Sequence, residues 1–206
     1  MRSKLTFATL LLLTLTATHS YAQKSMEWGL TAGGNYFRVG GRSWDHQYHL
    51  AFSGGAYAEF NFNKYLTLQP ELLFNQVLCK TSADFNQIYS GLGGVSYQLV
   101  SVDYVALPIL LAFKPTPMLS ILFGPQYSYA IAQTKGLLQE EPNQNAFSHS
   151  DVALVFGAQL NLNPLKVGVR YQEGLNNVNA IGSTDEWRIY GFQFYLTYQF
   201  GDRKLK

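Results

Sequence analysis

Residues 187–200 of the chain read WRIYGFQFYLTYQF, and this stretch decides the fold. Successive side chains of a β-strand point to opposite faces, so every second residue shares a face. One face here is apolar and aromatic, with Tyr190, Phe192, Phe194, Leu196, Tyr198 and Phe200. The other face is mostly polar, with Gly191, Gln193, Tyr195, Thr197 and Gln199. In a soluble sandwich the apolar face would line a core, whereas in an outer-membrane barrel it would face lipid.

The same alternation recurs along the chain and predicts an all-β protein of eight strands. The expected strands are residues 27–37, 50–62, 65–76, 102–114, 119–132, 151–162, 165–172 and 187–200. Their connections alternate between long and short, which is typical of an antiparallel up-and-down transmembrane barrel with long loops at one end. The last strand must then pair with the first, because only closure leaves no strand edge exposed in lipid.

Two details of these strands are less regular. The long connection 77–101 is expected to extend its flanking strands in part as a hairpin above the membrane. Pro108 lies inside the fourth strand, where a proline usually causes a bulge or a break in pairing. The face opposite Val105 in that strand also carries apolar residues, so its alternation is the least clean.

The chain begins with the features of an export signal. Arg2 and Lys4 precede an apolar run, and small residues precede a cleavage point after Ala22. We therefore expect a signal peptide over residues 1–22 and a single barrel domain over residues 23–206. A transmembrane anchor is the alternative, but the strongly apolar part is shorter than the ~20 residues that a spanning helix needs.

The composition fits a barrel with a lipid-facing surface. Charged residues make up 14% of the chain, against about 25% in an average soluble domain. A soluble lipocalin-like barrel would carry many charges on its polar faces, yet here those faces are mostly Gly, Ser, Thr, Gln and Asn. After removal of the leader, 13 basic and 13 acidic residues remain, without a basic stripe. This balance gives no electrostatic case for nucleic-acid binding.

The charged residues predicted to face the lumen are Glu59, Glu71, Lys166 and Arg170, with Lys114 near a strand end. A barrel of eight strands is just wide enough for its own side chains, so such charges must pair or be solvated. We expect a charge network in which Arg170 bridges to Glu71 or Glu59 and closes the interior. A gate or ion path is the alternative.

The expected loops carry residues that could do chemistry. A lipid-modifying enzyme at the rim would use a Ser or Asp with a His, and the candidates are His46, His49, Ser148, His149, Ser150 and Asp151. No nucleophile-elbow pattern surrounds them, and metal binding at Asp45, His46 and His49 is only weakly indicated. We therefore predict no enzyme, cofactor or metal. The apolar loop residues could be binding anchors or could fold over the barrel mouth; they are Trp44, Tyr48, Phe85, Tyr89, Leu137, Leu138 and Phe147.

Three runs resemble the small outer-membrane β-barrel family typified by PorT. They are GGAYAEFNFNKYLTLQPELLFNQ at residues 54–76, VDYVALPILLAF at 102–113 and LFGPQYSY at 122–129. The order of the Gln-Pro-Glu-Leu, Leu-Pro and Gly-Pro motifs in them is similar to that family, although Ala106 stands where an acid is expected. The resemblance implies an outer-membrane location in a Bacteroidota-type envelope, and its founding member is associated with type IX protein secretion.

These observations predict an integral outer-membrane barrel with a non-catalytic role. We expect a structural or interaction component of the cell envelope, with a link to type IX secretion as its finer form. A small rim enzyme modifying lipid A and an extracellular adhesin or ligand-binding barrel are the alternatives. The expected partners are outer-membrane lipids, the barrel-assembly machinery and an envelope protein.

Overall fold

The structure, a computed structural model, describes residues 26–182 and 185–200 as a closed antiparallel barrel. The barrel runs in sequence order through β1 (Met26–Gly40), β2 (His49–Asn61), β3 (Leu66–Lys80), β4 (Leu99–Thr116), β5 (Leu119–Gln133), β6 (Ser150–Asn161), β7 (Leu165–Gly174) and β8 (Arg188–Phe200). The all-β, eight-stranded prediction is confirmed. The expected signal peptide lies outside the described residues.

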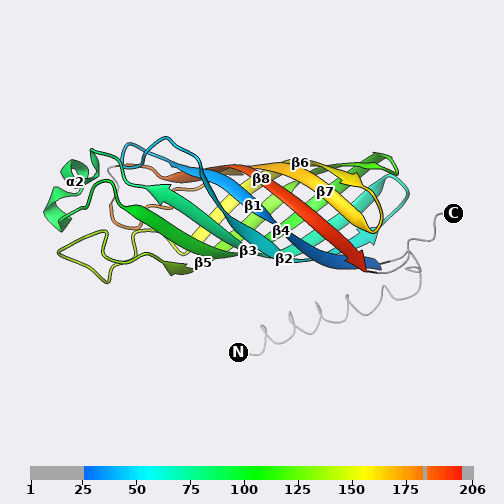
Figure 1. The fold of residues 1–206 in the computed structure, drawn as a ribbon, viewed down its shortest axis with the longest axis horizontal. Helices are drawn as coiled ribbons and strands as arrows, with labels where there is room; N and C mark the ends of the chain where they lie inside the picture. The colour runs from blue at the N-terminus through cyan, green and yellow to red at the C-terminus, as the bar shows by residue number, and fades with distance from the viewer. Residues whose placement is uncertain (1–25, 183–184, 201–206) are drawn as a thin grey trace, which may run out of the picture.

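β8 closes the barrel against β1, as predicted. The pairing runs without interruption from Trp28 opposite Phe200 to Gly40 opposite Arg188. The rings of Trp28 and Phe200 also pack together, with centroids 4.7 Å apart. The start of β1 and the end of β8 lie at the end of the barrel with the tight turns, and the long loops gather at the opposite end (Figure 1).

Between the tight turns and the region near the long loops, the barrel has apolar side chains outside and polar side chains inside. In β8, Phe194 is 52% exposed on the outer surface, whereas its neighbour Gln193 is 3% exposed inside. The same alternation runs through the other strands. A soluble barrel would have the reverse arrangement, so the outer surface is suited to lipid.

The pattern inverts near the loop end of the barrel. In β1, Asn35 is the last polar residue inside, and Phe37 and Val39 then turn inward while Arg38 lies on the outer side. Other strands also place apolar side chains inside at this end: Val77, Cys79, Val100, Val102 and Ile189. Apolar groups turn inward where the surroundings become aqueous, so the inversion marks the upper edge of the membrane-spanning band.

Several strand limits differ from the sequence expectation because of this inversion. β1 continues to Gly40, and β3 and β4 extend to Lys80 and back to Leu99, which forms the expected hairpin extension. Pro108 interrupts the β3–β4 pairing, as expected for a proline inside a strand, because no pair lies between Pro70 opposite Ile109 and Leu73 opposite Ala106; the register does not shift across this gap. The irregularities of the β4–β5 ladder lie elsewhere, between residues 103 and 104 and between 113 and 116.

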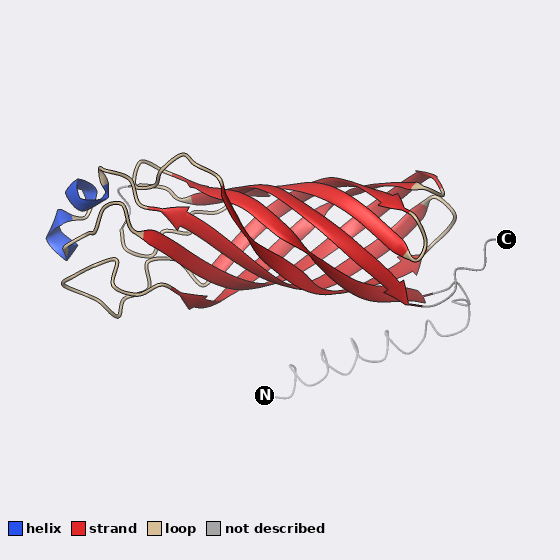
Figure 2. Ribbon diagram, viewed as in Figure 1, coloured by secondary structure: helices blue, strands red, loops and turns tan. Residues whose placement is uncertain are grey.

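Four loops connect the strands at the far end, and we name them L1 (residues 41–48), L2 (81–98), L3 (134–149) and L4 (175–187). L2 contains the short helices α2 (Phe85–Ile88) and η1 (Ser90–Leu92), which the alternation did not reveal. They lie at the tip of the molecule, beyond the strands (Figure 2). Among the described residues, no helix has the length and apolar character needed to cross a membrane.

Candidate functional site

The part of the lumen near the tight turns holds a buried carboxylate between two ammonium groups. Glu59 of β2 is fully buried and accepts hydrogen bonds from Lys114 of β4, at 2.8 Å, and from Lys166 of β7. The ammonium group of Lys166 also lies 4.8 Å from the ring centroid of Tyr57, and it interacts with the charge of Glu27 of β1. The two acids and two bases balance, as burial in a narrow lumen requires.

A second charged pair lies in the lumen further from the tight turns. Nη1 of Arg170 in β7 donates to a carboxylate oxygen of Glu71 in β3 at 2.8 Å, across the barrel. Nε of Arg170 donates to Gln193, and Nε2 of Gln69 donates to the other oxygen of Glu71 at 2.8 Å. The guanidinium group also lies over the ring of Tyr195, 4.9 Å from its centroid. Each charge is therefore both paired and hydrogen-bonded.

Uncharged polar groups fill the space beside this pair. Nε2 of Gln193 donates to Ser53 at 2.6 Å and to Asn75 at 3.1 Å, which joins β8 to β2 and β3. Tyr195 crosses the lumen over Gly168, where a Cβ atom would lie 2.2 Å from the tyrosine ring. Its hydroxyl donates to Gln159 at 3.2 Å. Hydrogen bonds between side chains in the interior thus connect most strands of the barrel wall to one another.

The sequence-predicted lumen residues therefore do not form a single cluster. Arg170 meets Glu71, one of the two partners offered for it, while Glu59 and Lys166 meet each other in a separate layer. Lys114 completes that layer, although its place near a strand end gave little reason to select it. The register that brings β4 and β7 to opposite sides of Glu59 cannot be read from alternation alone.

The rim residues considered for catalysis point apart. Asp151 faces the lumen, where Nε2 of Gln172 donates to it at 3.5 Å. The hydroxyl of Ser150 bonds to that of Tyr127 at 3.0 Å. His149 is exposed and lies against Tyr129 with its ring. No hydrogen bond described here links these three residues into a relay.

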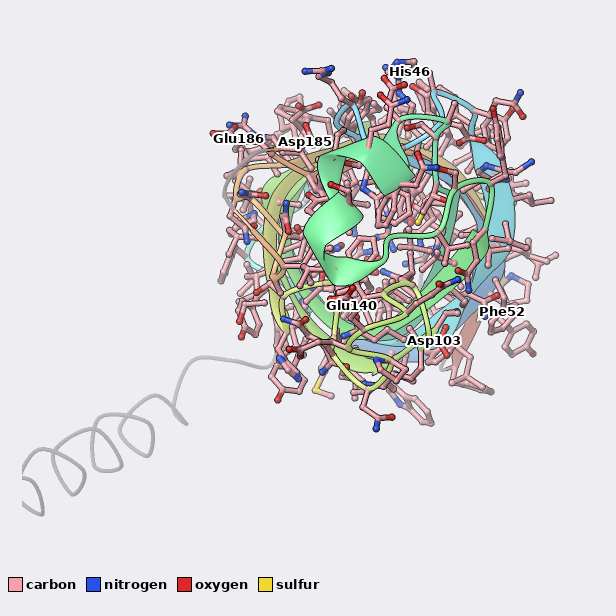
Figure 3. The ribbon with its side chains drawn as sticks, turned by 90° about the vertical axis from the view of Figure 1, so that its left-hand side faces the viewer. His46, Phe52, Asp103, Glu140, Asp185 and Glu186 are labelled. Atoms are coloured by element: carbon pink, nitrogen blue, oxygen red, sulfur yellow. The ribbon has the colours of Figure 1, made fainter. Side chains whose placement is uncertain are left out.

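His46 of L1 and His49 at the start of β2 also remain separate. His49 bonds to Asp45 at 3.3 Å, and His46 lies at the outer edge of the loop end of the barrel (Figure 3). Within residues 26–182 and 185–200, no group of three or more His, Cys, Asp or Glu residues could hold a metal ion.

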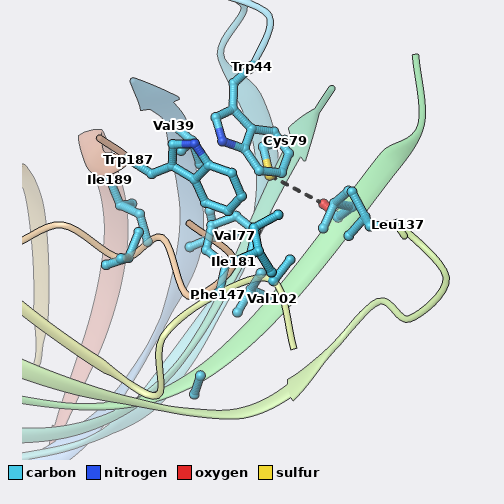
Figure 4. Close-up of a cluster of buried hydrophobic side chains, with 14 of the residues drawn as sticks. Val39, Trp44, Val77, Cys79, Val102, Leu137, Phe147, Ile181, Trp187 and Ile189 are labelled. Carbon is cyan, nitrogen blue, oxygen red and sulfur yellow. Dashed lines mark hydrogen bonds between the residues drawn. The ribbon is translucent and has the colours of Figure 1, made fainter. Parts of the chain in front are cut away.

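An aromatic cluster caps the barrel mouth, and each of the four loops contributes to it. Trp44 of L1, Phe85 of L2, Phe147 of L3 and Trp187 of L4 are all buried. The ring centroids of Trp44 and Trp187 lie 4.9 Å apart, and Phe147 lies 5.2 Å from Trp44 and 5.3 Å from Trp187. Leu137, Ile181 and Cys79 surround the rings (Figure 4). We call these side chains and the loops that carry them the loop cap.

Hydrogen bonds also join neighbouring loops of the loop cap into a ring around its aromatic side chains. Ser82 of L2 donates its amide to the Ser43 carbonyl of L1 at 2.9 Å, and Val95 of L2 donates to Leu137 of L3 at 3.1 Å. Ser148 of L3 donates to Val178 of L4 at 2.7 Å. Each loop is thereby held by its neighbours as well as by the aromatic core.

Asp185 completes the ring between L4 and L1. Its carboxylate accepts hydrogen bonds from the Ser43 amide at 2.8 Å, the Ser43 hydroxyl at 2.6 Å and the Arg42 amide at 3.1 Å. Nε1 of Trp187 donates to the same carboxylate at 3.3 Å. Burial alone would raise the pKa of Asp185, but these donors outweigh burial and hold the pKa below its usual value of 3.8.

The loop cap answers the question that the sequence left open about the loop aromatics. Six of the seven residues lie in the cap, namely Trp44, Phe85, Tyr89, Leu137, Leu138 and Phe147. Tyr48 differs, because it stacks on Tyr36 at the outer surface of the barrel. Trp187 was expected only as the start of a strand. In the structure it lies in L4, and its ring packs against those of Trp44, Phe85, Tyr89 and Phe147.

A closed barrel with an apolar outer belt and long loops at one end defines the class of small outer-membrane β-barrel proteins. Residues 21–179 match the model of the outer membrane protein beta-barrel domain family. The chain therefore belongs to this family and is an integral protein of the outer membrane.

Two solved structures resemble the fold. Neisserial surface protein A aligns with a TM-score of 0.50 at 14% identity, over 85% of this chain and 99% of that one. The attachment invasion locus protein Ail of Yersinia pestis aligns with a TM-score of 0.45 at 13% identity, over 86% of this chain and 100% of that one. A search of curated proteins finds no match. At these identities the likeness concerns the fold alone.

Proposed function

We propose that the protein is a non-catalytic recognition barrel of the outer membrane, which binds a partner through its loop cap. The observation that carries this proposal is the burial of one aromatic residue from each of the four loops in a common core. Loops ordered in advance lose little conformational entropy when they bind, which favours a recognition surface. The charged pairs that fill the lumen argue against a conducting pore.

The resemblance to PorT-type barrels favours one finer form of this proposal, in which the partner belongs to a type IX secretion machine. In that form the barrel is an interaction component of the envelope. A rim enzyme is less favoured, because Ser150, His149 and Asp151 have different hydrogen-bond partners.

The outer belt supports two further partners in this proposal. We place lipid against the aromatic strand faces, including a hollow of about 830 Å³ over β1, β2 and β3, where Ala32, Gly54 and Ala56 leave room beside larger side chains. We also place the barrel-assembly machinery at β8, because the outer face of this strand is apolar and aromatic.

Co-purification tests the proposed role. A tagged barrel is cross-linked in cells, extracted in mild detergent and compared with a W187A variant, in which the loop cap has lost its central ring. A stoichiometric protein recovered with the wild type and lost with W187A supports recognition through the cap. If that protein is a secretion component, the finer form holds. Recovery of the wild-type barrel alone, even after cross-linking, contradicts recognition of a protein through the cap.

A further inference from the structure

A groove lies between L1 and L2, against Trp44 of the loop cap. It has a volume of about 440 Å³ and is lined by Arg42, Asp45, His46, Lys80, Asp84 and Tyr97, together with Trp44 and other side chains of the two loops. Pockets of this size hold small ligands or one unit of a larger one, since ligand sites span roughly 300–1,000 Å³. None of the chemistry described above uses this groove.

The two walls of the groove are held in place by direct hydrogen bonds between the loops. The amide of Asp45 donates to the Lys80 carbonyl at 2.8 Å, and the hydroxyl of Ser82 donates to the Arg42 carbonyl at 2.7 Å. Trp44 pairs with Thr81 in an isolated β-bridge and anchors its side chain in the aromatic core. The groove is therefore a formed site, which a ligand need not organise.

Tyr97 gives this groove an aromatic platform at an energetic cost. Its backbone has φ of 60°, in the left-handed region that a side chain with a Cβ atom rarely adopts. Its side chain is 66% exposed, and Nζ of Lys80 lies 5.7 Å from the ring centroid. Strain and exposure of a large ring both disfavour tyrosine here, and packing within the protein does not offset them. Such a residue indicates a functional constraint on this position.

The charges around Tyr97 are available for a ligand. Within the described residues, the side chains of Arg42, Lys80 and Asp84 have no ion-pair or hydrogen-bond partner, and the ammonium group of Lys80 lies beside the ring of Tyr97. Asp45 bonds to His49. Two cations and two carboxylates thus line the same groove as one exposed ring, so the groove offers donors and acceptors without a strong net charge.

From this arrangement we infer that the groove binds a pyranose sugar of a cell-surface glycan. The C–H face of a pyranose ring is apolar and stacks on the face of an aromatic side chain, while its rim of hydroxyl groups needs both donors and acceptors. Tyr97 would take the face, Asp45 and Asp84 would accept from hydroxyl groups, and Arg42 would donate to them. The balance of charge favours a neutral sugar over a polyanion. This inference rests on the proposed recognition role and names a ligand class for it.

A glycan array tests the inference directly. The full barrel is purified in a detergent without a sugar headgroup and applied to neutral and anionic pyranosides, and the strongest hit is then titrated. We expect saturable binding to neutral pyranosides. Y97A should weaken binding by about tenfold or more, the scale of one lost stacking contact. Y97F should bind as the wild type, and R42A and D84A should each weaken binding about fivefold, the scale of one lost hydrogen bond.

Two further variants keep the result interpretable. Y65A removes an exposed tyrosine at the opposite end of the barrel and should leave sugar binding unchanged. Y97G removes the ring as Y97A does but also relieves the backbone strain, so it should weaken binding to the same extent as Y97A while the barrel stays at least as stable as the wild type. The inference is overturned if no pyranoside binds, if only anionic ones bind, or if Y97A and Y97G bind like the wild type. A protein partner still captured through the cap would then leave the broader recognition role standing.

Discussion

The lumen and the loop cap are both interiors of the same barrel, but they are built from opposite chemistry. In the lumen, Glu59 and Glu71 are buried with basic partners. In the loop cap, Trp44, Phe147 and Trp187 pack ring against ring. Within the membrane band lipid takes the apolar side chains and leaves polar ones for the inside, whereas water around the loops drives apolar side chains inward. The surroundings thus decide which groups fill each interior.

The first prediction removes a buried ion pair of the lumen and has the largest expected effect on the stability of the whole barrel. E71L leaves Arg170 buried without its carboxylate, so we expect a loss of about 3–5 kcal/mol in the free energy of unfolding. The measurement is urea unfolding of the barrel in lipid vesicles. The matched control is the double variant E71L/R170M, which removes both charges and should recover much of the loss. Equal losses for the single and double variants would contradict the pairing.

The second prediction breaks the cap and leaves the barrel wall intact. W187A removes the ring that contacts Trp44 and Phe147, a truncation that costs about 3–5 kcal/mol in a packed core. Because the cap lies beyond the strands, this loss should appear locally. We expect faster cleavage of the loops by protease in intact vesicles, with unchanged heat-modifiable migration of the barrel on gels.

The matched control for that experiment is W28A. Trp28 is an outward-facing tryptophan at the tight-turn end, 51% exposed. Its removal should leave the loops as resistant to protease as in the wild type. Loops that remain resistant in W187A would show that the aromatic core does not hold them.

The contrast between the two interiors also explains how far the sequence could predict the structure. Alternation reveals the eight strands and the closure of β8 on β1, because lipid enforces one polarity over the whole band. Above the band the polarity inverts, so an expected strand ending at Phe37 in fact continues to Gly40. The expected limits of β1, β3 and β4 were therefore wrong at the loop end, whereas those of β2, β5, β6 and β8 agree to within one residue.

The site was predictable only in part for the same reason. Glu59 and Glu71 could be placed on the inner face, but their partners depend on the register between strands far apart in the sequence. The loop aromatics were visible, yet loops have no periodicity that shows which way a side chain points. The strained backbone of Tyr97 likewise leaves no signal in the sequence, since tyrosine is not a residue type typical of that conformation.

The third prediction concerns the outer belt, where the lipid side of the contrast can be tested. Replacing both Tyr198 and Phe200 of β8 with Asp places charges on a face that lipid covers, at a cost of up to about 1 kcal/mol per charge near the membrane edge. We expect a lower level of assembled barrel in outer-membrane fractions. The same change at Tyr97, which faces water, should leave assembly unchanged. Normal levels of the Tyr198 and Phe200 variant would contradict a lipid-facing belt.

The smallest expected effect is a pH dependence of the loop cap. The pKa of Asp185 lies below its ordinary value of 3.8 in the folded protein, so its hydrogen bonds to L1 stabilise the cap above that pH. This contribution should be lost as the pH falls through the lowered pKa. Protease resistance of L1 and L4 should then decrease on acidification in the wild type. D185N, which lacks this titration, should show a weaker cap at neutral pH and less change with pH.

Hydrogen exchange in the loops tests the central claim most directly, namely that the cap is ordered without a partner. The informative amides belong to Arg42, Ser82, Val95 and Ser148, because each donates a hydrogen bond to a neighbouring loop. In the purified barrel in lipid bilayers we predict protection of these amides that approaches the protection of the strands. Exchange at the rate of an unstructured chain would contradict a preformed loop cap and the recognition role built on it.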